Sequence, residues 1–217
     1  MIERKFVAEK LRECQIEEFI AQNLRGAGHS ATKLQRTPLG EKVIIYASRP
    51  GLVVGRKGQN IKELTKILKK EFKSENPQIE ISEVENPNMD ANIVAERIAD
   101  SLEKFGANRF KGIGHKILTD VMNAGALGIE VVISGKIPSA RAKTWRFYSG
   151  YLKKCGDVAI EGVQRAYKTA KLKVGIVGIK VKIMPPTIQL PDKIVLIDQK
   201  ITEEKSPKEA KDETKGA

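Results

Sequence analysis

The stretch Val53-Val54-Gly55-Arg56-Lys57-Gly58-Gln59-Asn60-Ile61 joins a short apolar run to a basic pair framed by two glycines. Beyond it, apolar residues recur at a spacing that places them along one side of a helix, at Ile61, Leu64, Ile67, Leu68 and Phe72. The glycines therefore bracket a turn that enters a helix. Because glycine has no side chain, a nucleic-acid backbone can approach the main chain closely here, while Arg56 and Lys57 supply positive charge.

This loop resembles the GXXG loop of KH domains, which holds a few nucleotides of single-stranded backbone. The pattern alone is weakly specific, because residues 125–128 and 175–178 also match it, and we interpret both as turns. Only the loop at Gly55 has basic residues between its glycines and an amphipathic helix after them. A helix-capping turn with two exposed charges is the alternative. Neither G-x-x-x-x-G-K-[ST] nor a G-x-G-x-x-G between strand and helix occurs, so nucleotide binding has no support.

The composition is that of a globular protein with a large surplus of positive charge. Its 217 residues are 41% hydrophobic and 30% charged, with a net charge of +12 and a pI of about 9.6. Such a surplus predicts affinity for polyanions. No apolar stretch is long enough to span a bilayer, so we expect nucleic acid and not a membrane as the partner.

The N-terminal residues indicate the cellular compartment, and the two cysteines indicate whether a disulfide or a zinc site is present. The N-terminus mixes charges and lacks the apolar core of a secretory signal, so we expect a cytoplasmic protein. Cys14 and Cys155 lie far apart without a C-x-x-C. They indicate neither a disulfide framework nor a zinc site, and we expect reduced, partly buried thiols and no metal or cofactor.

The first half of the chain predicts one small α+β domain over residues 16–86, after an N-terminal extension over residues 1–15. An amphipathic helix over residues 16–24 stops at Gly26, and a strand-like segment leads to the turn at Pro38. Residues 43–47 form a β-branched strand, and Ile79 and Ile81 alternate with polar neighbours in another. The resulting order of helix, strand, strand, helix, loop, helix and strand is that of type II KH domains.

The second half predicts another α+β domain, over residues 87–190, after a polar connection at residues 85–88. Asp90 is positioned to cap a helix with the buried stripe Val94, Ile98, Leu102 and Phe105. A second helix, with Ile113, Ile117, Leu118, Val121 and Met122 apolar, ends before Gly125. Residues 129–134, 145–151 and 179–183 have strand patterns, whereas residues 158–172 fit helix or strand equally. Residues 191–217 form an extended segment and a charged tail, disordered from Thr202.

Five blocks together resemble the family of the third small-subunit ribosomal protein, in its archaeal form. The blocks are residues 5–8 (KFVA), 28–30 (GHS), 51–58 (GLVVGRKG), 125–135 (GALGIEVVISG) and 175–185 (GIVGIKVKIMP). They occur in the family's order and span nearly the whole chain except the tail. The resemblance implies a type II KH domain followed by an α+β domain with two helices on a four-stranded sheet, in which residues 158–172 form a strand.

The resemblance also implies a function. It predicts a structural constituent of the small ribosomal subunit, bound to ribosomal RNA in the lower part of the head near the mRNA entrance. Its partners would be that RNA, the mRNA and neighbouring head proteins, with no small-molecule substrate and no catalytic residue. The family's KH loop carries over to Gly55, Arg56, Lys57 and Gly58, and we add Asn60 and Lys62 at the start of the following helix.

A second candidate RNA surface lies in the C-terminal domain. No acidic residue occurs between Val131 and Gly156, and the aromatic residues Trp145, Phe147, Tyr148 and Tyr151 lie among cations. These cations are Lys136, Arg141, Lys143, Arg146, Lys153 and Lys154. Cations bind phosphates and aromatic rings stack on bases. The alternative is an edge strand protected by lysines, with its aromatics in the core. Both interpretations hold if aromatics alternate to one face and cations to the other.

A third group matches a basic helix that, in some members of the family, lines the mRNA entrance and helps to unwind the message. It consists of Arg109, Lys111, His115 and Lys116, and it is sparser here because Gly112 and Gly114 interrupt it. We interpret His115 as solvated or facing RNA, and His29 as a loop residue beside the first helix.

Two other functions compete with the ribosomal one. A KH-type RNA-binding regulator outside the ribosome would share the loop, although the order of the two domains argues against it. A lysine-dependent lyase acting on damaged DNA would need a desolvated lysine with a lowered pKa. The sequence singles out no such lysine.

Overall fold

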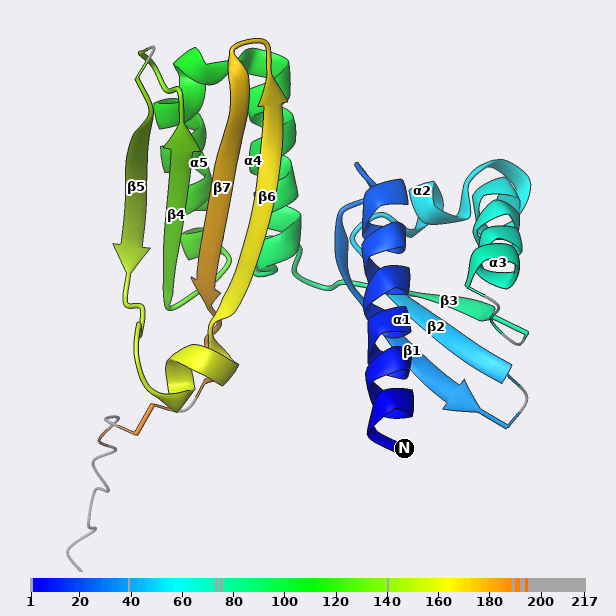
Figure 1. The fold of residues 1–217 in the computed structure, drawn as a ribbon. Helices are drawn as coiled ribbons and strands as arrows, with labels where there is room; N and C mark the ends of the chain where they lie inside the picture. The colour runs from blue at the N-terminus through cyan, green and yellow to red at the C-terminus, as the bar shows by residue number, and fades with distance from the viewer. Residues whose placement is uncertain are drawn as a thin grey trace, which may run out of the picture.

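The computed structural model describes residues 2–38, 40–72, 74, 76–139, 141–188, 190–191 and 194. Two units, each with its own apolar core, are joined by a connection near residues 84–90 (Figure 1). Ile20, Ile45 and Leu68 belong to the first core, and Ile98, Val131 and Val181 to the second. The predicted disordered tail lies outside the described residues.

The N-terminal unit is a three-stranded sheet with helices packed on its buried face. Its elements are α1 (Ile2–Asn23), β1 (His29–Thr37), β2 (Gly40–Ala47), α2 (Pro50–Val54), the 3-10 turn η1 (Arg56–Gly58), α3 (Gln59–Glu71) and β3 (Gln78–Glu83). The middle strand β2 pairs antiparallel with β1 and parallel with β3. Alternation along β2 buries Val43 and Ile45 in the same cluster as Ile16 of α1 and Leu68 of α3. The predicted element order is confirmed.

Helix α1 is longer than the sequence pattern predicted. It begins at Ile2, whereas periodicity indicated a helix only from Ile16, because Ile16 and Ile20 are the positions that pack against the sheet. In the first half of α1, the large apolar side chains of Phe6 and Leu11 are exposed. The first half of α1 has no buried apolar stripe, so the spacing of apolar residues could not detect it.

The C-terminal unit is a four-stranded antiparallel sheet with both helices on one face (Figure 1). Its elements are α4 (Ala91–Phe105), η2 (Ala107–Arg109), α5 (Phe110–Asn123), β4 (Gly128–Gly135), β5 (Lys143–Gly150), the π-helical turn η3 (Val158–Gly162), β6 (Gln164–Leu172) and β7 (Gly175–Met184). The strand order is β5-β4-β7-β6, so β5 and β6 are the edges. This architecture confirms the predicted α+β fold.

Several local predictions for this unit need correction. The strand expected over residues 158–172 begins only at Gln164, after a helical turn. Phe105 is exposed at the end of α4 and is not part of the buried stripe. Asp90 occupies the N-cap position, but its side chain makes no capping hydrogen bond and instead bonds with Ser30. Burial raises the pKa of Asp90, and the bond with Ser30 partly offsets this.

Two smaller predictions are also wrong. Cys14 and Cys155 are exposed and not partly buried. His29 is the first residue of β1 and not a loop residue, and its Nε2 lies 2.8 Å from Thr32 Oγ1. Within the described ranges, no helix is both long and apolar enough to cross a membrane.

Hydrogen bonds join the two units where the chain passes between them. The Gly26 amide donates to Glu96 Oε1 at 2.7 Å, and Asn92 Nδ2 donates to the Ser30 carbonyl oxygen at 2.7 Å. Both bonds connect the segment around β1 to the start of α4. They attach the KH-like unit directly to the helical layer of the second unit.

Candidate nucleic-acid interface

The backbone of the glycine-framed loop explains why both glycines are present. Gly55 has φ 71° and ψ −179°, a conformation accessible essentially only to glycine. Gly58 has φ 72° and ψ 22°, which is the left-handed helical region. Lys57 lies in the same region, with φ 53° and ψ 26°. The left-handed turn connects α2 to α3 and carries Arg56 and Lys57 as exposed side chains.

The Asn60 side chain holds the loop in place through a hydrogen bond. Its Nδ2 donates to the Leu52 carbonyl oxygen at 3.0 Å, so it binds the end of α2 from the first turn of α3. A Cβ atom on Gly55 would lie 2.6 Å from Asn60 Cγ. Asn60 was predicted from the sequence as an RNA contact, and the structure adds a positioning role that spacing alone did not reveal.

The loop presents positive charge that the described part of the protein does not neutralise. Arg56, Lys57 and Lys62 are exposed, and no described carboxylate forms an ion pair with any of them. Helix α3 starts at this loop without a side-chain cap, so its first amide groups point toward the same region. Exposed cations, close-approach glycines and a helix N-terminus together suit a phosphate backbone.

Strand β5 divides its aromatic residues between two faces. Trp145 and Phe147 point toward the helices, where Trp145 lies 5.2 Å from the Phe110 ring and donates Nε1–H to the Ile137 carbonyl oxygen. Tyr148 is exposed on the other face, with the Arg146 guanidinium 5.2 Å from its ring centre. The expected separation of aromatics from cations is therefore wrong at Tyr148, since strand alternation places it beside Arg146.

Glu130, which was not predicted as a site residue, lies one residue before the stretch without acids. Its buried side chain pairs with Arg146, with Lys154 Nζ at 3.4 Å and with Lys182 Nζ at 3.7 Å. Desolvation acts to raise the pKa of Glu130, but these three cations lower it overall. Two predicted RNA-binding residues, Arg146 and Lys154, thus also neutralise an internal carboxylate. A lone Glu within an apolar strand was the available signal.

The remaining predicted cations lie on three parts of the C-terminal unit: the β4–β5 connection, the segment after β5, and η2 with α5. Lys136, Arg141 and Lys143 are exposed at the β4–β5 connection, and half-buried Lys153 has its Nζ 5.9 Å from the Tyr151 ring centre. Arg109, Lys111, His115 and Lys116 are exposed on η2 and α5.

Helix α5 and strand β5 combine into one surface. The Lys111 ammonium lies 5.1 Å from the Trp145 ring centre, and the His115 ring is edge-on to Phe147 at 5.4 Å. A hollow of about 520 Å³ between them is lined by His115, Arg146 and Tyr148, among others. Two groups that were separate in the sequence thus become neighbours, whereas the loop between α2 and α3 lies at the opposite end of the molecule (Figure 1).

Comparisons with known proteins agree with this two-unit structure. The KH domain family model matches residues 15–89, and the model of the ribosomal protein S3 C-terminal domain matches residues 98–183. Small ribosomal subunit protein uS3 of Methanocaldococcus jannaschii is 47% identical over 196 residues, covering 90% of this chain and 93% of that protein. The uS3 protein of Methanococcus vannielii is 45% identical over 203 residues, covering 94% and 95%. The chain belongs to the uS3 family.

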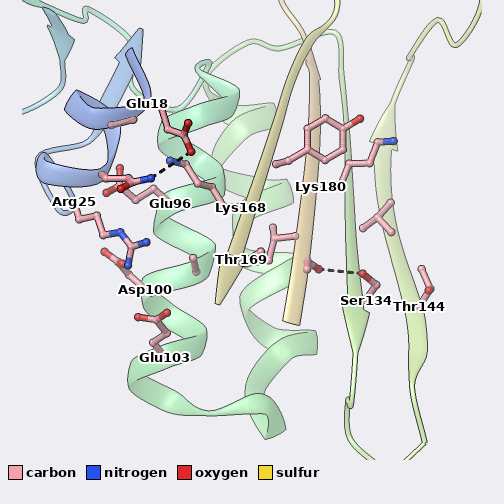
Figure 2. Close-up of a pocket in the computed structure, with 17 residues that line it drawn as sticks. Glu18, Arg25, Glu96, Asp100, Glu103, Ser134, Thr144, Lys168, Thr169 and Lys180 are labelled. Carbon is pink, nitrogen blue, oxygen red and sulfur yellow. Dashed lines mark hydrogen bonds between the residues drawn. The ribbon is translucent and has the colours of Figure 1, made fainter. Parts of the chain in front are cut away.

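One further hollow in this uS3-family chain differs in charge from the basic surfaces. A groove of about 820 Å³ lies between α1, α4 and the β6 edge of the sheet (Figure 2). Its helical wall carries Glu18, Glu96, Asp100 and Glu103, whereas Lys168 and Lys180 come from the sheet. These carboxylates disfavour a phosphate backbone along the helical wall itself, whereas the sheet side of the groove, which includes Tyr167 and Lys180, contributes no carboxylate to this lining. Nor do the described residues gather three or more potential metal-ligating side chains at any point.

Proposed function

We propose that this chain is a structural constituent of the small ribosomal subunit in the cytoplasm and binds ribosomal RNA through two surfaces. The first surface is the glycine-framed loop with Arg56 and Lys57. The second is the α5–β5 surface, which carries Lys111 and Arg146 among its cations. The observation that carries the proposal is the loop at Gly55, where two exposed cations without a described acidic partner project from a glycine-only turn.

The two surfaces have different tasks within this proposal. The loop clamps a few nucleotides of ribosomal RNA, because its glycines let the sugar-phosphate backbone contact the main chain. The α5–β5 surface, in the lower part of the subunit head, borders the mRNA entrance and contacts the passing message. Support comes from the exposure of Arg109 at the end of η2 and of Lys111 and Lys116 on α5. Neighbouring head proteins bind other parts of the chain.

A structural role also accords with the surroundings of the lysines. Every lysine whose side chain the structure describes is exposed or half-buried. None of these described lysines is therefore the desolvated amine that the Schiff-base chemistry of a lysine-dependent lyase requires.

Co-sedimentation tests the proposal directly. The purified chain is mixed with small subunits or, as a control, with large subunits, in magnesium and high salt, and is separated on a sucrose gradient. High salt screens unspecific attraction between a basic protein and RNA, so only specific contacts persist. We expect the chain to migrate with small subunits alone. A chain that stays at the top of the gradient, or follows both subunits equally, would contradict the proposal.

A further inference from the structure

The four-stranded sheet of the C-terminal unit has one face without helices, which we call the open face. The helices α4 and α5 both lie on the opposite side (Figure 1). The strand register aligns side chains on the open face in rows: one row is Arg146, Val132, Lys180 and Tyr167, and the next is Tyr148, Glu130, Lys182 and Arg165. Figure 2 shows Lys180, Ser134 and Thr144 on neighbouring strands of this sheet.

The open face is basic, and its one carboxylate in these rows is already neutralised. Arg165, Lys180 and Lys182 join Arg146 and the nearby Lys154, which makes five cations against Glu130. The Glu130 side chain is only 8% exposed. Its carboxylate forms ion pairs with Arg146, Lys154 and Lys182. These ion pairs fix the positions of the three cations, and the buried carboxylate presents little negative charge to a ligand. An approaching phosphate backbone would therefore meet positive charge across the four strands.

Two tyrosines are exposed on opposite edge strands of this face. Tyr148 of β5 is 70% exposed and Tyr167 of β6 is 63% exposed. Each ring has a cation over one side, since Arg146 lies 5.2 Å from the Tyr148 centre and Lys180 lies 5.0 Å from the Tyr167 centre. The cation orients the ring and leaves its other side open to a stacked base. Three inter-strand spacings separate the two strands, roughly 14 Å.

We propose that the open face binds a single-stranded segment of RNA, with bases stacked on Tyr148 and Tyr167 and phosphates held by Lys180 and Lys182. This inference rests on the proposed ribosomal function and extends the α5–β5 surface, with which the open face shares Arg146 and Tyr148, onto the side of the sheet without helices. The core of a protein-docking patch is depleted of charged residues. Here the apolar positions are a half-buried Val132 and an exposed Ile176 beside five cations, so the charge favours RNA.

The test compares tyrosine variants of the full-length chain. Tyr148→Leu, Tyr167→Leu and the double variant are titrated with a fluorescent single-stranded RNA of about ten nucleotides, a length within the usual site sizes. Tyr46→Leu is the matched control, because Tyr46 also lies beneath a lysine, Lys33 at 5.5 Å, but in the other unit. The titrations are repeated in the Arg56→Asp/Lys57→Asp background, which removes the loop's contribution. Circular dichroism and melting verify the fold of each variant.

We expect each open-face variant to bind about five-fold more weakly or worse, as for removal of one base–aromatic stack, while the control stays close to the parent. RNA containing 5-iodouridine should crosslink to Tyr148 or Tyr167 upon irradiation. Unchanged affinity in both backgrounds would overturn the inference, and co-sedimentation of the parent would leave the proposed function standing. If the tyrosine variants keep the RNA affinity of the parent but fail to co-sediment with small subunits, the open face would instead bind a protein partner, which would also overturn the inference. A parent that binds no RNA would overturn both proposals.

Discussion

Gly114 of α5 lies so close to Phe147 of β5 that a Cβ atom on the glycine would be 3.0 Å from ring carbons Cδ2 and Cε2. The absence of a side chain thus lets the helix approach the strand. A glycine inside a helix is unfavourable by about 1 kcal/mol relative to alanine. Gly114 therefore weakens the helix but permits close packing against Phe147. The same approach brings His115 edge-on to the Phe147 ring.

Replacing either of two glycines in this helix by alanine should therefore have different effects on stability. Gly112→Ala should raise the free energy of unfolding by up to about 1 kcal/mol, since nothing lies within 4 Å of the added Cβ. Gly114→Ala should be less stable than Gly112→Ala by about 1–3 kcal/mol, because the Phe147 ring must shift. Urea unfolding of both variants measures the difference. Equal stabilisation by the two would show that the ring moves without cost.

The two glycines of the loop should also differ. Gly58→Asn places a residue that tolerates left-handed backbone in open space, whereas Gly55→Asn requires a glycine-only conformation and clashes with Asn60. We expect Gly55→Asn to lower the unfolding free energy by about 1–3 kcal/mol more than Gly58→Asn. Chemical denaturation of the pair tests this, and a similar decrease at both sites would refute the assignment of distinct backbone roles.

Charge reversal in the loop should weaken RNA binding without unfolding the protein. In Arg56→Asp/Lys57→Asp the glycines remain, and aspartate tolerates the left-handed backbone at position 57. The log-log salt dependence of binding should flatten by roughly 0.7 for each single-strand phosphate that the loop no longer neutralises. Lys69→Asp/Lys70→Asp, at the far end of α3, changes net charge equally and should retain most of the salt dependence. Equal flattening in both variants would mean that only net charge matters.

Stability should depend on His29 at mildly acidic pH. Burial, with a smaller contribution from the Lys168 charge, lowers the pKa of His29 from 6.5 to about 4. The unfolded chain therefore takes up a proton more readily than the folded one, so His29 favours folding fully above pH 6.5 and progressively less as pH falls toward 4. The ring is only partly shielded, so the expected decrease in stability is on the order of 1–3 kcal/mol.

Unfolding free energies of the parent and of His29→Gln between about pH 4 and 7 measure this contribution. The variant should lose less stability upon acidification than the parent. A direct NMR titration is simple because the chain has two histidines. An ordinary pKa for His29 would contradict the burial argument.

Sequence spacing predicted best where a segment has one consistent burial environment. The alternation of Ile179, Val181 and Ile183 and the stripe of Leu64 and Leu68 correspond to faces that are buried along their whole length. The loop at Gly55 was also predictable, because the need for glycine arises from local backbone angles. The order of elements in the N-terminal unit could be derived in this way, whereas the pattern of residues 158–172 in the second unit left helix and strand open.

Tertiary packing decided the features that depend on residues distant in the sequence. Glu130, Arg146, Lys154 and Lys182 form one charge cluster only because the strands pair in a particular register. The packing of both helices on one side of the sheet leaves Tyr148 and Arg146 on the open face and brings α5 beside β5. Local periodicity determines which side of an element is apolar, because side-chain direction repeats along a helix or strand. Which charges then meet across elements depends on long-range pairing, and no single stretch of sequence contains that information.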